Sequence, residues 1–241
     1  MLDAAVGAVA RALADVGDLR VVTDRPGQYH LDVVTDEAAV DVLVGAGLGV
    51  VSEESGVHHA QREITVVVDP IDGSTNASRG VPWFATSLCA VDRDGPRAAV
   101  VVNQASGERF AAVRGAGATC DGRLVEPSAC RRLDDAIIGV SGLPGAHWGW
   151  AQFRALGAAA LDLCYVADGR LDGYVALSGG LAPWDYLGAL LVCQESGTEV
   201  VDAEGRPLVV LDHGARRAPV AAPPTLLAEL LDVSGRVRDG S

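Results

Sequence analysis

The sequence of 241 residues contains no lysine, so all 19 of its basic residues are arginines. This absence excludes any mechanism that needs a lysine to form a Schiff base or to hold a phosphate. The five cysteines are widely spaced and form no Cys-x-x-Cys pair, which favours reduced thiols over a zinc site or a disulfide framework. No apolar run approaches the roughly 18 residues of a membrane span, and the first residues lack the basic region of a signal peptide. We therefore expect a cytoplasmic protein with no membrane partner.

Acidic residues outnumber basic ones by 32 to 19, which gives a formal net charge of −13. Nucleic acids are bound mainly by arginine and lysine side chains that neutralise phosphates, so this charge argues against a nucleic-acid partner. A small anionic substrate would also be repelled, unless some of the carboxylates hold divalent cations that reverse the local field. The acidity of the chain is thus compatible with an anionic substrate at a metal site.

Hydrophobic periodicity and turn residues predict alternating helices and strands in both halves of the chain. We expect an N-terminal α+β lobe over residues 1–133 and a C-terminal α/β lobe over residues 134–241. The clearest helix runs from Pro183 to Gly197, because proline suits a first helical turn and glycine a C-terminal cap. The other expected helices lie at residues 2–16, 36–46, 148–156 and 226–231, and the expected strands at 64–68, 86–91, 98–103, 109–113, 136–140, 161–167, 172–177 and 199–201.

The segment Asp69-Pro70-Ile71-Asp72-Gly73-Ser74-Thr75 directly follows a β-branched run that predicts a buried strand. The chain must turn between the two aspartates, and such a turn can direct both carboxylates and the Ile71 carbonyl to one cation. Hard oxygen ligands of this kind suit Mg²⁺. The small residues that follow expose backbone N–H groups that a phosphate can approach. The alternative is an Asx turn capped by Ser74 that binds no ligand.

Two further acidic segments are Ser52-Glu53-Glu54-Ser55-Gly56 and Pro183-Trp184-Asp185. Each alone has a simpler explanation, the first as a solvated loop and the second as an acid that favours a helix dipole. Taken in chain order, the three segments resemble the hallmarks of the inositol monophosphatase superfamily. Members of this superfamily are Mg²⁺-dependent, lithium-sensitive phosphomonoesterases. The resemblance extends through residues 157–164 and covers nearly the whole chain, weakening in the first 35 residues. It implies an α/β (α+β) fold with α-β-α-β-α layers, two packed lobes with the site between them, and a homodimer.

The resemblance also assigns metal ligands by position. It implies that Glu53, Asp69 and the Ile71 carbonyl hold one Mg²⁺, and that Asp69, Asp72 and Asp185 hold a second. Some family members bind a third ion near Glu53, and Mn²⁺ is an expected substitute for Mg²⁺. The sequence lacks the family's lysine before the segment 32–36, so an outer-shell role for Asp36 or Glu37 stays open.

The catalytic assignments follow from the same resemblance. Ser74 stands where the family has the hydroxyl residue that, with Glu53, orients the attacking water, and Asp72 completes the predicted catalytic set. The backbone of Gly73, Ser74 and Thr75 is expected to receive the phosphate. A metal-bound water is more acidic than bulk water, and a second metal can stabilise a leaving alkoxide, so no protein nucleophile is required.

The expected substrate contacts are Arg154, Ala158, Ser178 and Asp185. Ala158 replaces the family's small hydroxyl residue, and the neighbourhood 177–181 lacks the glutamate that binds substrate hydroxyls in inositol-preferring relatives. A site without these polar groups should discriminate less sharply among polyols. Arg154 could serve the substrate or a partner subunit.

The sequence therefore predicts a Mg²⁺-dependent phosphomonoesterase that hydrolyses a small polyol or sugar phosphate, such as inositol 1-phosphate, through a metal-activated water. A histidinol phosphatase and a bisphosphate nucleotidase of the same superfamily are alternatives, the second disfavoured because no basic pocket for another phosphate is evident. An alternative of another class is a catalytically inactive metal-binding module with an interaction or regulatory role. The complete set of acidic ligands argues against that module.

Overall fold

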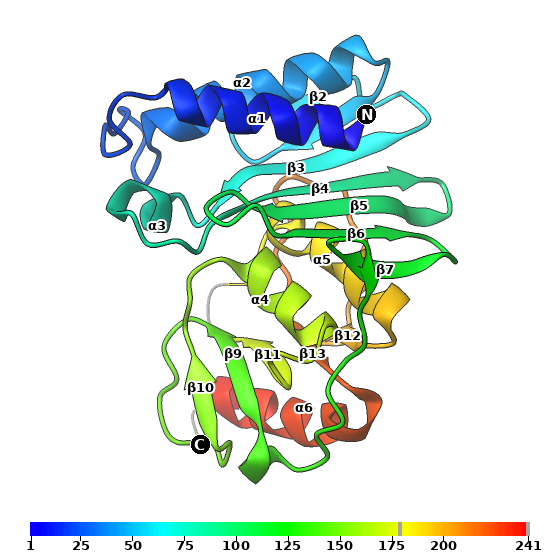
Figure 1. Cartoon of the computed structure of the whole chain (residues 1–241). Helices are drawn as coiled ribbons and strands as arrows, with labels where there is room; N and C mark the ends of the chain where they lie inside the picture. The colour runs from blue at the N-terminus through cyan, green and yellow to red at the C-terminus, as the bar shows by residue number, and fades with distance from the viewer. Residues whose placement is uncertain (178–179, 240–241) are drawn as a thin grey trace.

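The structure is a computed structural model that describes residues 1–177 and 180–239. Its helices and sheets form five layers (Figure 1). Helices α1 (Leu2–Asp15) and α2 (His30–Gly45) cover the first sheet, α4 (Ala159–Ala167) and α5 (Pro183–Ser196) lie between the two sheets, and α6 (Pro224–Asp239) covers the second. The predicted α/β class and its α-β-α-β-α layering are therefore confirmed.

The first sheet has eight strands in the order β2-β1-β3-β4-β5-β6-β7-β8. Strands β1 and β3 pair in parallel, and the other neighbours are antiparallel. The strands expected at residues 86–91, 98–103 and 109–113 are present in this sheet as antiparallel neighbours. The strands are β1 (Gly49–Ser52), β2 (Gly56–His58), β3 (Thr65–Asp72), β4 (Ala85–Asp92), β5 (Gly95–Asn103), β6 (Arg109–Val113), β7 (Gly117–Cys120) and β8 (Arg123–Leu124).

The second sheet has five strands in the order β10-β9-β11-β13-β12. Strand β9 pairs in parallel with both β10 and β11, while β13 is antiparallel to β11 and β12. A short 3₁₀ helix, η1 (Leu133–Asp135), leads into this sheet. The strands are β9 (Ile137–Ser141), β10 (Gln152–Arg154), β11 (Gly173–Ala176), β12 (Glu199–Asp202) and β13 (Pro219–Ala222).

Three predicted elements are wrong or misplaced. Residues 161–167 belong to helix α4 and not to a strand; the helix is buried on nearly every side, so its sequence lacks the polar face that marks an amphipathic helix. Residues 148–156 form a loop and strand β10, whose backbone pairs with β9, in place of a helix. Helix α2 begins at His30 and not at 36, because the Asp32 side chain accepts the Tyr29 N–H at 2.8 Å and caps an earlier start.

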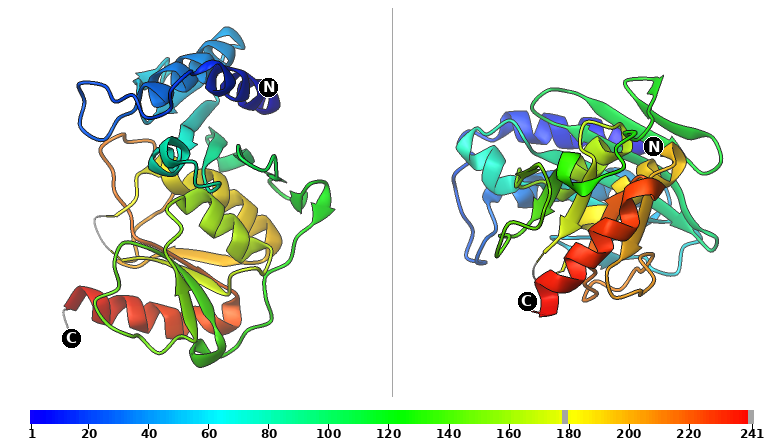
Figure 2. Two further views of the ribbon diagram at one scale, coloured as in Figure 1. Left: turned by 60° about the vertical axis from the view of Figure 1, so that its left-hand side comes forward. Right: turned by 90° about the horizontal axis from the view of Figure 1, so that it is seen from below.

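Among the described residues, one of three hydrophobic clusters spans both halves of the chain. It joins Val67 and Phe110 of the first sheet to Tyr174 and Ala221 of the second through the buried faces of α4 and α5. Helix α1, at the start of the chain, and helix α6, the last described element, lie at opposite ends of the molecule (Figure 2). We propose that the boundary between the N-terminal and C-terminal lobes lies near residue 133. Within the described residues, no helix combines the length and apolarity needed to cross a membrane.

Candidate active site

Asp69 and Asp72 both lie on β3, where a β-bulge takes the place of the expected sharp turn. Asp69 pairs with Ser87 of β4 and Asp72 with Ala85, so β3 carries an extra residue between the two aspartates. The hydroxyl of Thr86 donates to the carbonyl of Pro70 at 2.8 Å and holds the bulge. Bulges of this kind re-aim side chains and are frequent beside active sites. Both aspartates are buried.

Glu53 is brought beside this bulge by the parallel pairing of β1 with β3. Ser52, the last residue of β1, lies opposite Val68, and the Glu53 N–H donates to the Val68 carbonyl at 3.2 Å. Because Val68 precedes Asp69, the register places the first loop glutamate next to the first aspartate of the motif. The second glutamate, Glu54, forms an ion pair with Arg25 at 3.1 Å.

Asp72 and Asp185 are oriented by the starts of the two central helices. Oδ2 of Asp72 accepts the N–H of Ala160 at 2.7 Å, in the first turn of α4. Oδ2 of Asp185 accepts the N–H of Ala182 at 2.7 Å and caps its own helix, α5. Pro183 in the first turn of α5 agrees with the predicted helix start. An aspartate of the first sheet thus caps a helix that lies between the sheets.

These four carboxyl groups are desolvated and act on one another. Burial, together with the charges of Asp185 and Glu54, raises the pKa of Glu53 to about 8. Burial also raises the pKa of Asp69 well above its usual value, with Glu53 as the next cause, and it raises that of Asp72 likewise, with Asp185 next. The pKa of Asp185 rises to about 6, mainly through burial. Because the buried carboxylates repel one another, the arrangement favours the binding of protons or of a cation that neutralises their charge.

The donor chemistry of the cluster fits a hard divalent cation. Oδ1 of Asp69 is buried and has no hydrogen-bond partner among the described residues, which is costly for a carboxylate oxygen. In the conformation seen, no three carboxylate, imidazole or thiol groups of the described residues lie close enough together to enclose an ion. The carboxylates would therefore have to draw together around it. An all-oxygen set suits Mg²⁺ or Mn²⁺ better than a soft metal.

The residues after Asp72 form a tightly held loop that leads into α3 (Ser74–Arg79). Gly73 has φ of 88°, and a Cβ at this position would lie 3.0 Å from the carbonyl oxygens of both Trp83 and Gly157. The side-chain amide of Asn76 donates to the carbonyls of Trp83 and Leu156, both at 2.8 Å. Leu156 belongs to the C-terminal half, so Asn76 fastens the loop Gly73–Thr75 across the boundary between the two halves.

A cavity of about 200 Å³ opens beside the aspartates. Ala158 lies in its wall at the N-terminus of α4, where it presents a methyl group and no hydroxyl. Among the described residues, its lining is Asp72, Val140, Ser141, Gly157, Ala158, Ala159, Asp162, Leu181 and Asp185. The cavity is smaller than the roughly 300–1,000 Å³ of pockets for drug-sized ligands, so it suits a small metabolite.

Other predicted residues lie apart from this cluster or are engaged elsewhere. The Arg154 guanidinium donates to the Phe153 carbonyl at 2.8 Å and to the Gln152 side chain at 2.7 Å, all on β10. Asp36 is buried and accepts the Ser52 hydroxyl, while Glu37 is exposed. Ser178 lies outside the described residues.

Three residues near the cluster were not predicted. Asp32 is buried close enough to Ser74 and Glu54 for both to affect its pKa, which burial raises to about 7. Asp162 accepts the indole N–H of Trp83 at 2.9 Å. His213 contacts both the Glu53 loop and the start of α5. Only Asp32, in an acidic segment already noted at positions 32–36, gave a signal in the sequence.

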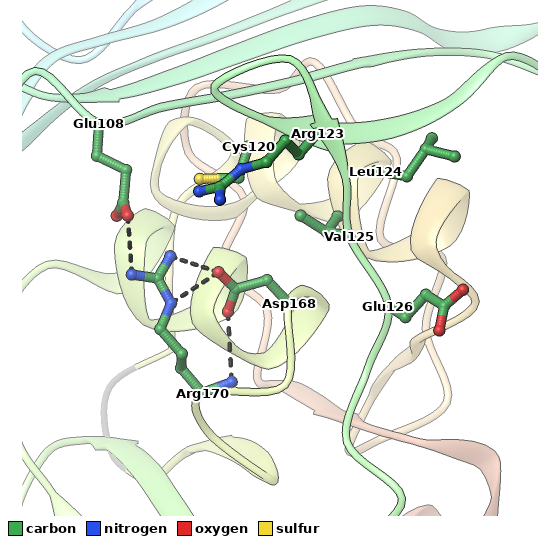
Figure 3. A pocket seen from close by; sticks show the side chains of 8 residues that line it. All are labelled: Glu108, Cys120, Arg123, Leu124, Val125, Glu126, Asp168 and Arg170. Atoms are coloured by element: carbon green, nitrogen blue, oxygen red, sulfur yellow. Dashed lines mark hydrogen bonds and ion pairs between the residues drawn. The ribbon is translucent and has the colours of Figure 1, made fainter.

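A larger cavity of about 420 Å³ lies elsewhere, between β7, β8 and the C-terminal end of α4 (Figure 3). Arg170 extends across it and forms ion pairs with Glu108 and Asp168. The guanidinium also stacks over Tyr165, with its carbon 3.4 Å from the ring centroid. Arg170 is therefore already paired with two carboxylates, and Arg123 and Glu126 also line this cavity. The three acidic segments do not line it, so the smaller cavity beside Asp72 and Asp185 is the better candidate.

Several known proteins resemble this chain in sequence and in fold. The model of the inositol monophosphatase family matches residues 30–234. An inositol-1-monophosphatase of Mesorhizobium japonicum is 34% identical over 230 residues, 86% of this chain and 84% of that protein. The Nus factor SuhB of Salmonella typhimurium is 36% identical over 172 residues, 65% of this chain and 63% of that protein. The crystal structure of the extragenic suppressor protein suhB of Bartonella henselae superposes with a TM-score of 0.80 at 27% identity, over 96% of this chain and 94% of that one.

The chain therefore belongs to the inositol monophosphatase family, as the three acidic segments indicated. Membership supports a phosphatase that acts on a phosphorylated small molecule.

Proposed function

We propose that this protein is a Mg²⁺-dependent phosphomonoesterase that hydrolyses a small polyol or sugar phosphate. The observation that carries the proposal is the convergence of Glu53, Asp69, Asp72 and Asp185 from three separate segments, with one buried Asp69 oxygen unpaired. Such mutually repelling carboxylates are costly to maintain without a cation. Family membership supports the same chemistry.

Two Mg²⁺ ions, with a third in some relatives, would be held by the four carboxylates and the Ile71 carbonyl, and Mn²⁺ would fit the same donors. When bound, such ions would make a water lose its proton more readily, so that it can attack phosphorus, and the ions themselves would neutralise the developing charge. Glu53 and Ser74 would orient that water. The carboxylate of Asp72 has its Oδ2 fixed by the Ala160 N–H, so its other oxygen is held in one direction.

The loop Gly73–Thr75 would bind the substrate phosphate through backbone N–H groups. The first N–H groups of a helix lack intrahelical partners and point along its axis, and α3 starts at Ser74. The Asn76 hydrogen bonds keep these donors in place before substrate arrives. Pre-organised donors lower the barrier because they need no rearrangement during the reaction.

The cavity beside Asp72 and Asp185 would receive the alcohol part of the substrate. Its Ala158 methyl supports a pocket with few direct hydroxyl contacts, and hence modest selectivity among polyols. The Mesorhizobium relative's name favours inositol 1-phosphate as the first substrate to try. Histidinol phosphate and bisphosphorylated nucleotides remain the alternatives, and a cytoplasmic homodimer remains the expected form.

The test is phosphate release from a panel of inositol, sugar, histidinol and nucleotide phosphates with Mg²⁺ present. We expect inositol or sugar monophosphates to give the highest kcat/KM. Asp185→Asn should abolish release, whereas Asp94→Asn, in the exposed turn between β4 and β5, should leave it unchanged. Release from nucleotide bisphosphates alone would replace the polyol assignment.

The second candidate is a binding or regulatory module without turnover, which the similarity to Nus factor SuhB favours. Folded wild-type protein that binds Mg²⁺ but releases phosphate from none of these compounds would put this candidate first. The presence of all four acidic residues supports the enzyme instead.

A further inference from the structure

One imidazole contacts the residue that directly precedes a proposed metal ligand in each half of the chain. Nε2 of His213 lies 3.1 Å from the carbonyl oxygen of Ser52, and Glu53 is the next residue. The ring of His213 also packs on Trp184, with the centroids 4.5 Å apart and the planes inclined by 45°, and Asp185 is the next residue. Because a carbonyl only accepts, Nε2 must carry the proton in this contact.

The segment that carries His213 is anchored at its base. The backbones of Leu181 and Arg217 exchange two hydrogen bonds, at 2.6 Å and 2.8 Å. The Arg217 Nε also donates to the Pro207 carbonyl at 2.7 Å. The Arg216 guanidinium donates to the His213 carbonyl at 3.2 Å and lies 5.4 Å from the Trp184 ring centroid. His213 is therefore presented from a segment fixed to the same chain stretch that leads into α5.

The Ser52 side of the contact is equally fixed. The Ser52 hydroxyl donates to Asp36 of α2, and the following N–H, that of Glu53, donates to Val68. A displacement of the His213 ring would thus act on a short segment with little freedom to compensate. The imidazole spans the gap between the Glu53 loop and the α5 start.

We infer that His213 is a positioning residue that sets the separation between Glu53 and Asp185, and with it the affinity of the site for Mg²⁺. This inference rests on the proposed function, since it takes the four carboxylates as the metal ligands. Side chains that orient ligands from outside the coordination shell change metal affinity or activity about 10- to 100-fold when they are replaced.

Three variants separate the two contacts of the ring. His213→Phe keeps an aromatic ring on Trp184 but loses the donor to Ser52, His213→Gln keeps a donor but loses the ring, and His213→Ala loses both. His147→Phe makes the same chemical change at an exposed histidine and serves as the control. Circular dichroism and the midpoint of thermal unfolding without metal show whether each variant folds.

The readouts are Mg²⁺ affinity by titration calorimetry and the Mg²⁺ concentration for half-maximal phosphate release. We expect His213→Phe and His213→Ala to weaken Mg²⁺ binding about 10-fold or more, with His213→Gln between them and wild type, and with the KM for substrate at saturating Mg²⁺ nearly unchanged. Unchanged Mg²⁺ affinity in folded His213→Phe and His213→Ala would overturn the inference, as would activity lost at unchanged affinity. Wild type that binds Mg²⁺ but hydrolyses nothing would contradict the proposed function alone, because calorimetry still decides the role of His213.

Discussion

The indole nitrogen of Trp83 lies 2.9 Å from Oδ1 of Asp162 and donates a hydrogen bond to it across the boundary between the two halves of the chain. Trp83 follows the loop at α3, and Asp162 sits in the first turn of α4. The Trp83 ring also meets Tyr165 edge-on, with centroids 4.6 Å apart. The backbone of the same tryptophan accepts from Asn76. Trp83 thus connects the candidate phosphate loop to the helix whose first turn orients Asp72.

Asp162→Asn should remove a pH-dependent loss of stability while keeping an acceptor for Trp83. Burial raises the pKa of Asp162 to about 7, against the opposing effect of the indole bond. Between about pH 4 and pH 7 the folded chain therefore holds a proton that the unfolded chain releases, so this carboxyl lowers the free energy of unfolding as pH rises through that window. We expect the free energy of unfolding of the variant, measured in urea relative to wild type, to rise by about 2–4 kcal/mol from about pH 5 to pH 8. A difference that does not change with pH would contradict the assignment.

Asp72→Asn should stabilise the metal-free protein and destroy its activity. The amide oxygen can still accept the Ala160 N–H, so the fold should persist, while the repulsion between Asp72 and Asp185 disappears. We expect phosphate release to fall by at least about 100-fold and the thermal midpoint to stop rising when Mg²⁺ is added. Equal turnover in this variant would remove Asp72 from the metal site. Asp94→Asn again serves as the control.

Gly73→Ala and Gly80→Ala form a matched pair at the two ends of α3. Both glycines have positive φ, 88° and 71°, but a Cβ at Gly73 would meet two carbonyl oxygens at 3.0 Å, whereas at Gly80 it would meet nothing within 4 Å. Gly80→Ala should cost about 1–2 kcal/mol of stability from backbone strain alone. Gly73→Ala should cost about 3 kcal/mol or more and abolish phosphate release. Equal effects would show that the loop around Gly73 is not closely packed.

Asn76→Ala should reduce activity more than its effect on stability suggests. It leaves two carbonyls, those of Trp83 and Leu156, without their donor, at a cost of about 1–3 kcal/mol. Loosening of the loop Gly73–Thr75 should lower kcat/KM about 10- to 100-fold. Asn103→Ala removes a buried asparagine whose Oδ1 accepts the Ala105 N–H at 2.9 Å and whose amide reaches the Pro82 carbonyl only at 3.5 Å, so it should cost stability without this kinetic loss. Parallel steady-state kinetics and unfolding curves on both variants decide the point.

The acidic segments were predictable because their chemistry is local. Asp69 and Asp72 follow a β-branched run, and Asp185 lies in a helix marked by Pro183 and Gly197. The order of these segments also predicted the family. Their convergence was implied by resemblance, and the structure adds how it arises, through the parallel register of Ser52 with Val68 and the bond of Asp72 to Ala160.

The remaining features depend on contacts between distant parts of the chain. Ser52 and His213 are 161 positions apart, and Trp83 and Asp162 are 79 apart, so no local pattern joins either pair. Helix α4 was mistaken for a strand because both of its faces are covered, one by each neighbouring layer, and a fully buried helix shows no 3.6-residue alternation. Residues 148–156 do not form the predicted helix because they contain β10, and this strand depends on its pairing with the distant strand β9.

The most direct test of the account is phosphate release from inositol 1-phosphate as Mg²⁺ is titrated from zero, with lithium added at the optimum. The account predicts no release without metal, a saturable rise with Mg²⁺ and inhibition by lithium. Release that persists at full rate after chelation of all divalent cations would contradict it, because the four carboxylates would then have no catalytic cation to hold.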